Sequence, residues 1–280
     1  MEEIRNAGLS KYTTVGIGGI AERMLIPETP EELISVMESE HPAYLIGGGS
    51  NLLIADRSFP LVVNLRKFDT SLEDLGEGRF RAGGSLRLQS FIQGINEKGY
   101  GGIEYLYSVP GLVGGALVMN AGRGESYHQS IADFVVSVRI WQRGEVRELS
   151  ADQCGFAYRD SVFRREGDCV ILSAEFLFPE KSREETEQAR KDRLALCRQV
   201  QDTSAPNFGT VFCRADPKIM ALVKRLRLSG KGVAFSGKTA NWILNTGGGS
   251  LKEADALMKK VEFMHRAARK ECRREVILWR

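Results

Sequence analysis

The sequence has no long apolar run, few histidines and no regular spacing of cysteines. No apolar stretch approaches the roughly 20 residues that a membrane-spanning helix requires, so we expect no membrane association. The five cysteines form neither a C-x-x-C pair nor a metal-finger pattern. Because irregularly placed cysteines are typical of free thiols, the sequence predicts a protein of a reducing compartment with no metal site.

The sequence also lacks a strong charge of either sign. Its 39 lysines and arginines nearly balance 36 aspartates and glutamates, which gives a formal net charge of +3. No basic run is laced with aromatic residues, so a nucleic-acid partner is not expected. The first ten residues, MEEIRNAGLS, are acidic and polar, unlike a secretory signal. We therefore expect a soluble, cytoplasmic protein, and no feature predicts a membrane or an obligate protein partner.

What the sequence does contain is typical of a globular protein, with 42% hydrophobic and 27% charged residues. A chain of 280 residues suits two or three subdomains better than one small core. Changes in the pattern of expected helices and strands place the boundaries so that the segments are 1–66, 67–182 and 183–280. The third segment begins with a charged helix that would act as a connector.

Capping boxes predict where several helices begin. Thr29-Pro-Glu-Glu32, with proline at the first helical position, opens one helix, and Ser250-Leu-Lys-Glu253 opens another. Apolar periodicity predicts the remaining elements. The other expected helices cover 88–95 (ending by Gly99), 182–200 and a segment beginning at Asp216-Pro217; the expected strands are 44–46, 61–65, 134–141, 145–149, 170–178 and 275–279.

Two glycine-rich stretches are the most informative part of the chain. One is Tyr44–Leu53 (YLIGGGSNLL) and the other is Pro110–Gly122 (PGLVGGALVMNAG). Glycines allow main-chain N–H groups to converge into a nest that holds an anion such as a pyrophosphate. Two such loops about 60 residues apart could hold two parts of one extended cofactor, so a large dinucleotide is the first interpretation. The Rossmann fingerprint does not apply, because its glycine spacing is absent and the chain after Gly49 is strand-like.

Four motifs in order extend this interpretation to a family. They are Thr13–Gly19 (TTVGIGG), Gly47–Leu53 (GGGSNLL), Pro110–Gly122 and Tyr158–Ser161 (YRDS). Together they resemble the UDP-N-acetylenolpyruvoylglucosamine reductases over about 9–278. The resemblance implies an α+β fold: a two-subdomain FAD-binding fold of the vanillyl-alcohol-oxidase/PCMH type, followed by a C-terminal α+β substrate domain. The modest length favours the shorter type of the family, which lacks an additional substrate-covering loop.

The resemblance also implies which residues bind the cofactor, FAD, between segments 1–66 and 67–182. Neither glycine loop contains histidine or cysteine, so the flavin is expected to be bound without a covalent link. The FAD-binding residues that it implies are Gly47, Gly48, Gly49, Ser50, Asn51 and Leu52 in the first loop, and Pro110, Gly111, Gly114, Gly115, Asn120, Ala121 and Gly122 in the second.

The activity implied is a two-step reduction in peptidoglycan precursor synthesis. NADPH reduces the flavin, which then passes hydride to C3 of the enolpyruvyl ether, and a proton reaches C2 to give UDP-N-acetylmuramate. Arg159 corresponds to the family arginine that stabilises the developing charge, and Glu275 to the family glutamate near the C-terminus. Thr210 stands where the family has its proton-donating serine, so this segment has diverged. Substrate contacts are expected from Tyr158, Lys231, Lys238 and Asn241.

The departures from the family pattern leave other interpretations open. Besides Thr210, the chain has Thr239 at a family histidine position and Gln201-Asp-Thr203 where Gln-Pro is common. A relative acting on a different nucleotide sugar or enol ether is one alternative. A catalytically silent regulator that binds a flavin or a nucleotide sugar is another. On simpler readings, Arg159 would form an ion pair with Asp160, and Glu275 would lie on a solvated strand edge.

Overall fold

The structure, a computed structural model, describes residues 1–280. None of its helices is both long and apolar enough to cross a bilayer. The α-helices are α1 (Pro30–Glu40), α2 (Leu88–Glu97), α3 (Val113–Val118), α4 (Val162–Glu166), α5 (Arg183–Val200), α6 (Pro217–Leu226) and α7 (Leu251–Ala267). The 3₁₀ helices are η1 (Leu9–Tyr12), η2 (Glu104–Leu106), η3 (Glu125–Tyr127) and η4 (Ile131–Phe134). The strands are β1 (Glu2–Gly8), β2 (Ile20–Ile26), β3 (Leu45–Ile46), β4 (Leu52–Ile54), β5 (Ser58–Asn64), β6 (Leu72–Gly76), β7 (Arg79–Gly83), β8 (Val135–Gln142), β9 (Glu145–Ser150), β10 (Cys169–Leu177), β11 (Asn207–Thr210), β12 (Phe212–Arg214), β13 (Val233–Phe235), β14 (Trp242–Asn245), β15 (Arg273–Arg274) and β16 (Ile277–Trp279).

By its internal contacts the chain divides into two compact units. Unit 1 comprises Met1–Glu3, Leu25–Gly48 and Val62–Leu196, and unit 2 comprises Ile4–Met24, Gly49–Leu61 and Cys197–Arg280. The first glycine loop therefore passes from one unit to the other. The segment boundaries expected after residues 66 and 182 follow sequence pattern rather than contacts, and they stay predictions.

The predicted helix starts are confirmed, because each is fixed by local hydrogen bonds. The Thr29 hydroxyl accepts from the Glu32 N–H (3.2 Å), and the Ser250 hydroxyl accepts from the Glu253 N–H (3.3 Å). The side chain of Asp216 caps α6 by accepting from two main-chain N–H groups of its first turn. Capping satisfies main-chain donors that have no partner inside the helix, which is why such signals can be detected in sequence.

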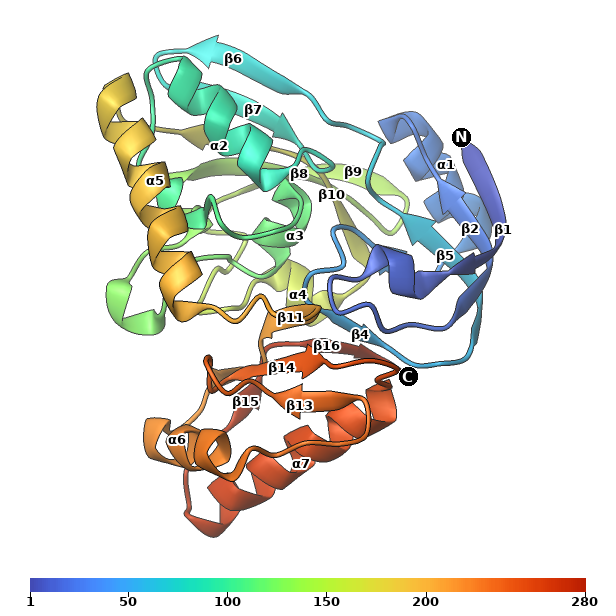
Figure 1. The fold of residues 1–280 in the computed structure, drawn as a ribbon. Helices are drawn as coiled ribbons and strands as arrows, with labels where there is room; N and C mark the ends of the chain where they lie inside the picture. The colour runs from blue at the N-terminus through green and yellow to red at the C-terminus, as the bar shows by residue number, and fades with distance from the viewer. The chain divides into compact units, whose positions relative to one another are not determined.

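A five-stranded antiparallel sheet forms the centre of unit 1. Its strand order is β6-β7-β10-β8-β9, and Ala174 in β10 pairs with Ala82 in β7 on one side and Val138 in β8 on the other. α3 packs against β7 and β10, and α2 packs against α3 (Figure 1). This arrangement places the second glycine stretch, which includes α3, directly on the sheet.

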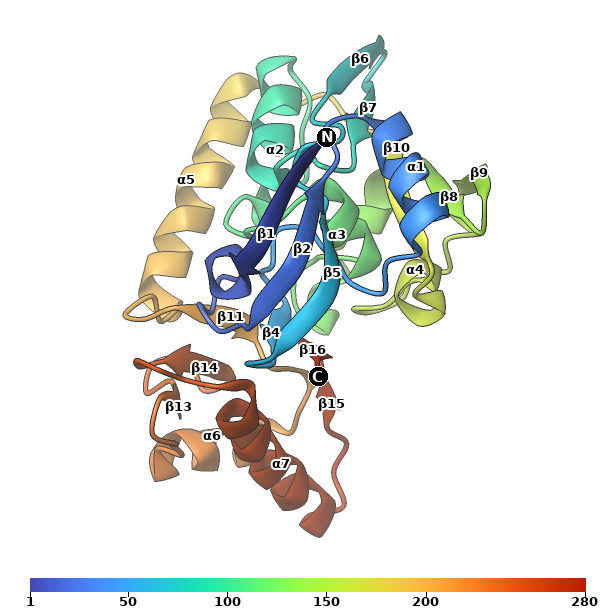
Figure 2. The ribbon, with the colours of Figure 1, turned by 90° about the vertical axis from the view of Figure 1, so that its right-hand side faces the viewer.

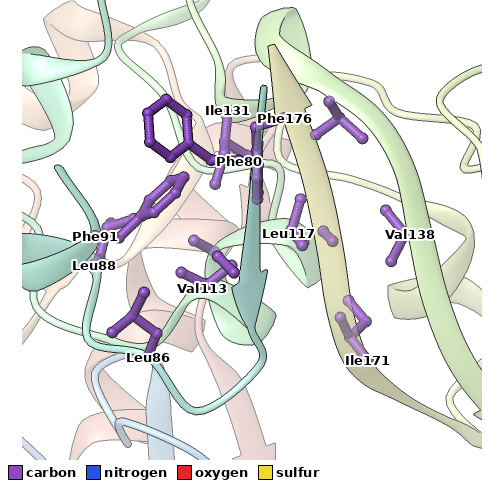
Figure 3. Packing of buried hydrophobic residues seen from close by; sticks show 14 of the residues in the cluster. Phe80, Leu86, Leu88, Phe91, Val113, Leu117, Ile131, Val138, Ile171 and Phe176 are labelled. Carbon is purple, nitrogen blue, oxygen red and sulfur yellow. The ribbon is translucent and has the colours of Figure 1, made fainter. Parts of the chain in front are cut away.

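The core of unit 1 is rich in phenylalanine. Phe91 from α2 and Phe176 from β10 are fully buried, with ring centroids 4.8 Å apart (Figure 3). Phe134 stacks on Phe178 at the same centroid separation. Aromatic pairs in this range contribute packing energy beyond their buried area. α3, the helix within the second glycine stretch, therefore belongs to a unit with a tightly packed core.

A four-stranded sheet of order β1-β2-β5-β3 contains residues from both units. Figure 2 shows β1, β2 and β5 side by side. β3 and β5 run parallel, with Leu45 opposite Val63, and both lie where strands are predicted. β1 and β2 were not predicted. β1 reads EEIRNAG and has mostly exposed side chains, so it carries no apolar alternation by which a strand is recognised.

Unit 2 contains a small sheet of order β11-β14-β13 together with α6 and α7. α7 packs against both α6 and β13 (Figure 2). Two further strand pairs, β12 with β15 and β4 with β16, bring distant segments together. The core of unit 2 includes Phe212, Val223 and Met258, whose side chains are at most 1% exposed.

The prediction of one strand over 275–279 is wrong at its start. The chain forms two short strands instead, with Glu275 and Val276 between them. β15 pairs antiparallel with β12, whereas β16 pairs parallel with β4. The chain changes partners at Glu275 and leaves the regular ladder there, which no local pattern in the sequence could reveal.

Candidate functional site

Within unit 1, Gly47 and Gly48 of the first glycine stretch lie against the second stretch. A Cβ atom added to Gly48 would lie 2.7 Å from the Cα of Gly111, closer than real Cβ contacts allow. A Cβ added to Gly47 would lie 3.5 Å from the Cδ1 atom of Leu112. Glycine is therefore required at position 48 for the two backbones to approach. Their proximity supports the interpretation that both loops serve one ligand.

The carbonyl groups of the three glycines in the first loop are all hydrogen-bonded. Arg66 donates from Nε to the Gly47 carbonyl (2.9 Å) and from Nη2 to the Gly48 carbonyl (3.2 Å), and the Gly49 carbonyl accepts from the Thr14 N–H (3.2 Å). The N–H groups of these three glycines are not donors in the main-chain network. With Gly49 in the left-handed region at φ +67°, the loop has the character of an anion-binding nest.

Arg66 supports the first loop, and the sequence interpretation missed it. It follows β5, and its N–H donates to the Asn64 side chain (3.1 Å), so the strand end fixes its position. A signal for it does exist, because polar residues at the carboxyl ends of parallel strands often face a ligand. Its positive charge lies beside the loop that is expected to hold the pyrophosphate.

The second glycine stretch is closed on one side and open on the other. The Gly114 N–H donates to the Gly84 carbonyl (3.0 Å), and an added Cβ on Gly114 would lie 3.1 Å from that oxygen. At Gly115, in contrast, an added Cβ would meet nothing within 4 Å. The surface around Gly115 can therefore be approached closely by a flat ring system.

Arg159 lies beside the end of this second stretch. Its guanidinium donates to the main-chain carbonyls of Gly122 (2.7 Å) and Asn120 (3.4 Å). Asn120 is buried, and its amide donates to the Ala157 carbonyl (2.9 Å) and accepts from the Ala132 N–H (3.3 Å). The structure thus brings Asn120 and Gly122, both predicted flavin ligands, together with the predicted catalytic arginine.

A tight turn presents Arg159. Ala157 and Asp160 exchange main-chain hydrogen bonds in both directions (3.0 and 3.1 Å), and Arg159 adopts φ +54° inside the turn. Its guanidinium lies 5.1 Å from the centroid of the Tyr158 ring. The Asp160 carboxylate pairs with Arg165 (2.6 Å), so the simpler reading of Arg159 as its ion-pair partner is not what the structure shows. A left-handed conformation in a bulky residue is uncommon and often marks a functional position.

In unit 2, a β-bulge presents Thr210. Asn207 pairs with Leu244 and Thr210 with Trp242, so β11 has one residue more than its partner between these pairs. Gly209 takes φ +75° inside the bulge. Bulges redirect side chains next to active sites. Thr210 is half-buried, and its hydroxyl makes no hydrogen bond within the protein, so it remains available to a ligand.

Glu275 is anchored next to Thr210. Its N–H donates to the carbonyl of Val211 (2.8 Å), the residue that follows Thr210, and its own carbonyl accepts from the Asn51 amide (3.1 Å). Glu275 is half-buried and its main chain is bonded on both sides, which differs from the solvated strand edge considered as the simpler reading. Two of the predicted catalytic residues therefore lie on neighbouring segments of unit 2.

A charge cluster on α7 supports the Glu275 segment from the adjacent residue. Arg274 pairs with Asp255 (Nη1–Oδ1 2.6 Å) and with Glu262, and the side chains of Arg274 and Asp255 are only 18% and 10% exposed. Burial raises the pKa of Asp255, but hydrogen bonds from Lys259 and Arg274 outweigh it and hold the pKa below its ordinary value. The cluster thus favours the ionised carboxylate in the folded protein.

Replacing Arg274 by methionine is expected to lower the free energy of unfolding by up to about 3 kcal/mol at neutral pH, because the mostly buried Asp255 carboxylate loses its least exposed partner. The folded-state pKa of Asp255 is depressed, so the stabilisation is present above its unfolded value and is lost as pH falls through the folded value. Denaturant titration at a series of pH values should therefore show that the difference in unfolding free energy between wild type and Arg274→Met becomes smaller in acid.

Lys259 provides the control, because it pairs with the same carboxylate but is 64% exposed. Lys259→Met is expected to change stability by less than about 1 kcal/mol. Equal losses for the two variants, or an Arg274→Met loss that does not change with pH, would contradict the role assigned to Arg274.

The predicted substrate ligands of unit 2 have structural contacts of their own. Asn241 accepts from the Phe212 N–H (3.1 Å) and donates to the Phe212 carbonyl (2.7 Å), which fixes the chain two residues beyond Thr210. Lys238 is exposed and donates to the Arg198 carbonyl (2.7 Å). Lys231 is exposed, and its N–H donates to Glu253 (2.8 Å). Their roles toward a substrate, like that of Tyr158 in unit 1, stay predictions.

Comparison with known proteins identifies the class first. Residues 21–150 match the FAD binding domain family, so the adjoining glycine loops belong to an FAD-binding flavoprotein. The chain is 32% identical over 275 residues to the UDP-N-acetylenolpyruvoylglucosamine reductase of Carboxydothermus hydrogenoformans, covering 92% of this chain and 87% of the relative. It is 33% identical to that of Parasynechococcus marenigrum, covering 94% and 91%. The chain belongs to the UDP-N-acetylenolpyruvoylglucosamine reductase family.

A solved structure agrees with this assignment. The crystal structure of the reductase from Thermus caldophilus superposes with a TM-score of 0.82 at 25% identity, covering 100% of this chain and 98% of that one. The predicted fold is confirmed: a two-subdomain FAD-binding fold of the vanillyl-alcohol-oxidase/PCMH type with a C-terminal α+β domain. FAD as the cofactor is confirmed with it.

The residues of this chain fit FAD. The N–H groups of the three glycines in the first loop do not donate in the main-chain network while their carbonyls accept hydrogen bonds, which suits a pyrophosphate. The open face at Gly115 leaves space that a Cβ would fill, as a flavin ring requires. The predicted ligands Ser50 and Leu52 continue the first loop, and Pro110 and Ala121 flank the second. Individual ligand roles stay predictions.

Two glycine-to-alanine variants distinguish a glycine needed for packing between the two loops, Gly48, from one expected to contact FAD, Gly115. Gly48→Ala is expected to lower the stability of the apoprotein by about 1–3 kcal/mol, because the new methyl group meets the Gly111 backbone. Gly115→Ala is expected to leave apoprotein stability unchanged or raise it by up to about 1 kcal/mol, as alanine favours the helix. Both variants are expected to bind FAD more weakly.

Thermal unfolding of the apoproteins and fluorescence titration with FAD measure the two effects separately. The distinctive result is for Gly115→Ala, which should lose FAD affinity without losing stability. Wild-type FAD affinity in this variant would show that the flavin does not cover the open face of α3.

Proposed function

We propose that this chain is an NADPH-dependent reductase that converts UDP-N-acetylenolpyruvoylglucosamine to UDP-N-acetylmuramate in peptidoglycan precursor synthesis. The observation that carries the proposal is the position of Thr210 in unit 2. Its hydroxyl has no hydrogen-bond partner in the protein, and the next residue, Val211, anchors the main chain of Glu275, in a chain of this family. Membership of the family supports the substrate, a UDP-sugar. Five free cysteines support a reducing location such as the cytoplasm.

The chain's own residues would each handle one part of the chemistry. Bound FAD supplies hydride transfer between NADPH and C3 of the enolpyruvyl group. Arg159 would bind the substrate carboxylate, since a planar guanidinium matches a carboxylate and stabilises the charge that develops there. The Thr210 hydroxyl would donate a proton to C2, which together with hydride at C3 saturates the double bond. Glu275 would orient the proton donor and the substrate.

The proposed division of labour follows the sequence segments. Segments 1–66 and 67–182 would hold FAD, and segment 183–280 would bind the substrate through residues such as Lys231, Lys238 and Asn241. The exposure of both lysines supports a role toward an external diphosphate.

Anaerobic half-reactions test the proposal. The purified protein should be yellow, NADPH should bleach its flavin band, and UDP-N-acetylenolpyruvoylglucosamine should restore it. With both added in turnover, the nicotinamide absorbance should fall in proportion to the substrate supplied. A flavin that NADPH cannot reduce would favour a silent flavin-binding or nucleotide-sugar-binding regulator.

One alternative substrate has a specific observation in its favour. Thr210 and Thr239 replace family residues in unit 2, and the Thr239 hydroxyl donates to the Val200 carbonyl (2.7 Å), an interaction that holds the diverged segment in place. A different nucleotide sugar or enol ether is therefore the second candidate. It is favoured if NADPH reduces the flavin but UDP-N-acetylenolpyruvoylglucosamine fails to reoxidise it.

A further inference from the structure

Asn51, a residue of the first glycine loop, is tied to the segment that carries Glu275. Its side-chain amide donates to the Glu275 carbonyl (3.1 Å), and its own carbonyl accepts from the Ile277 N–H (3.0 Å). Because a carbonyl can only accept, the amide nitrogen must face Glu275. The first of these bonds joins residues 224 positions apart in the chain, and both bonds lie within unit 2.

The bond from Asn51 lies at the point where regular strand pairing stops. Glu275 and Val276 lie between β15 and β16, so the Glu275 carbonyl has no place in either ladder. β4 and β16 pair from Leu52 and Ile277 onward. The Asn51 side chain thus adds one hydrogen bond beyond the paired residues of β4 and β16. This bond reaches Glu275, the residue that would take part in catalysis.

The opposite side of Glu275 is fixed by the strand that carries Thr210. The Glu275 N–H donates to the Val211 carbonyl (2.8 Å). The main chain at Glu275 is therefore held between the FAD loop through Asn51 and the Thr210 segment through Val211. Losing either hydrogen bond would release one side of the Glu275 main chain, which carries the carboxylate.

We propose that Asn51 is a positioning residue, which sets the place of the Glu275 carboxylate through the main chain and links the first glycine loop to the proton-transfer residues. The inference rests on the proposed function, because it assigns Glu275 a part in substrate reduction. An amide is required at position 51, since aspartate of the same shape would offer only acceptors to a carbonyl. Changing Asn51 should therefore slow substrate reduction more than it slows reduction of the flavin by NADPH, when both are measured per bound flavin.

The test measures both half-reactions per bound flavin, at saturating FAD, in wild type, Asn51→Asp, Glu275→Gln and the double variant. Asn51→Asp is expected to slow reoxidation by substrate by about 10- to 100-fold, as a displaced catalytic group does. Flavin reduction by NADPH, measured per bound flavin, should slow by a much smaller factor, because it does not use the Glu275 carboxylate. In the Glu275→Gln background, Asn51→Asp should cause no further loss, because both changes act on the same group.

The affinity of the apoprotein for FAD, its melting temperature and hydrogen exchange at 275–277 complete the test. Faster exchange in Asn51→Asp, with a melting transition retained, is the expected signature. If Asn51→Asp does not fold, Asn51→Ser replaces it in the same comparison of half-reaction rates. The serine side chain is too short to place its hydroxyl where the Asn51 amide donates to the Glu275 carbonyl. Full recovery of reoxidation at saturating FAD, or losses that multiply in the double variant, would overturn the inference. A wild-type protein that substrate never reoxidises would instead overturn the proposed function.

Discussion

Replacing Thr210 by alanine is expected to slow reoxidation of the reduced enzyme by its enolpyruvyl substrate by about 10²- to 10⁴-fold, the usual contribution of a positioned proton donor. The physical reason is that the bulge in β11 presents a hydroxyl with no partner inside the protein. Reduction of the flavin by NADPH needs no proton from this group and should keep its rate. Anaerobic stopped-flow absorbance measures the two half-reactions separately.

Serine at position 210 is the matched control. Thr210→Ser keeps the hydroxyl and removes only the methyl group that stiffens the side chain, so it should hold or raise the reoxidation rate. Equal reoxidation rates for threonine, serine and alanine would remove Thr210 from the mechanism. A parallel loss in both half-reactions of Thr210→Ala would indicate a disturbed strand instead, which its melting temperature would reveal.

Sequence patterns predicted elements whose signals are local. The helices beginning at Pro30 and Leu251 follow capping residues that satisfy their first N–H groups, and the structure confirms both. β1 could not be predicted in this way, because its mostly exposed side chains show no alternation and its place is set by pairing with β2. The break in the C-terminal strand at Glu275 depends likewise on two partner strands that lie far away in the sequence.

The same distinction applies to the site. Runs of glycine indicate places where backbone or ligand comes close to the main chain. The loops at 47–52 and 110–122 could therefore be identified from the sequence, without knowledge of the contact between Gly48 and Gly111. The position of Arg66 after a parallel strand is only a general signal for a site, and it does not predict that Arg66 bonds the carbonyls of the first loop. The bond between Asn51 and Glu275 spans almost the whole chain, and only the folded arrangement of unit 2 creates it.

Replacing Arg159 by lysine is expected to lower the rate of substrate reduction by about 10²- to 10³-fold, although the positive charge is kept. The Arg159 guanidinium donates to the carbonyls of Gly122 and Asn120 through the fixed, planar geometry of its fork. A lysine ammonium is a point charge that cannot hold these carbonyls and a planar carboxylate in one fixed geometry. The KM for the enolpyruvyl substrate should rise with the loss in rate, as measured by steady-state turnover.

Arg165 offers a control from the same region, because it pairs with Asp160 beside the turn and is 47% exposed. Arg165→Lys should change turnover and stability little, since exposed ion pairs contribute less than about 1 kcal/mol. Arg159→Lys also weakens the support of the Asn120–Gly122 turn, so FAD affinity must be measured alongside turnover. Lost turnover with FAD affinity retained would assign Arg159 to the substrate, whereas turnover that recovers at saturating FAD would assign it to the flavin turn. Wild-type turnover at low FAD would mean that the left-handed turn presenting Arg159 serves neither.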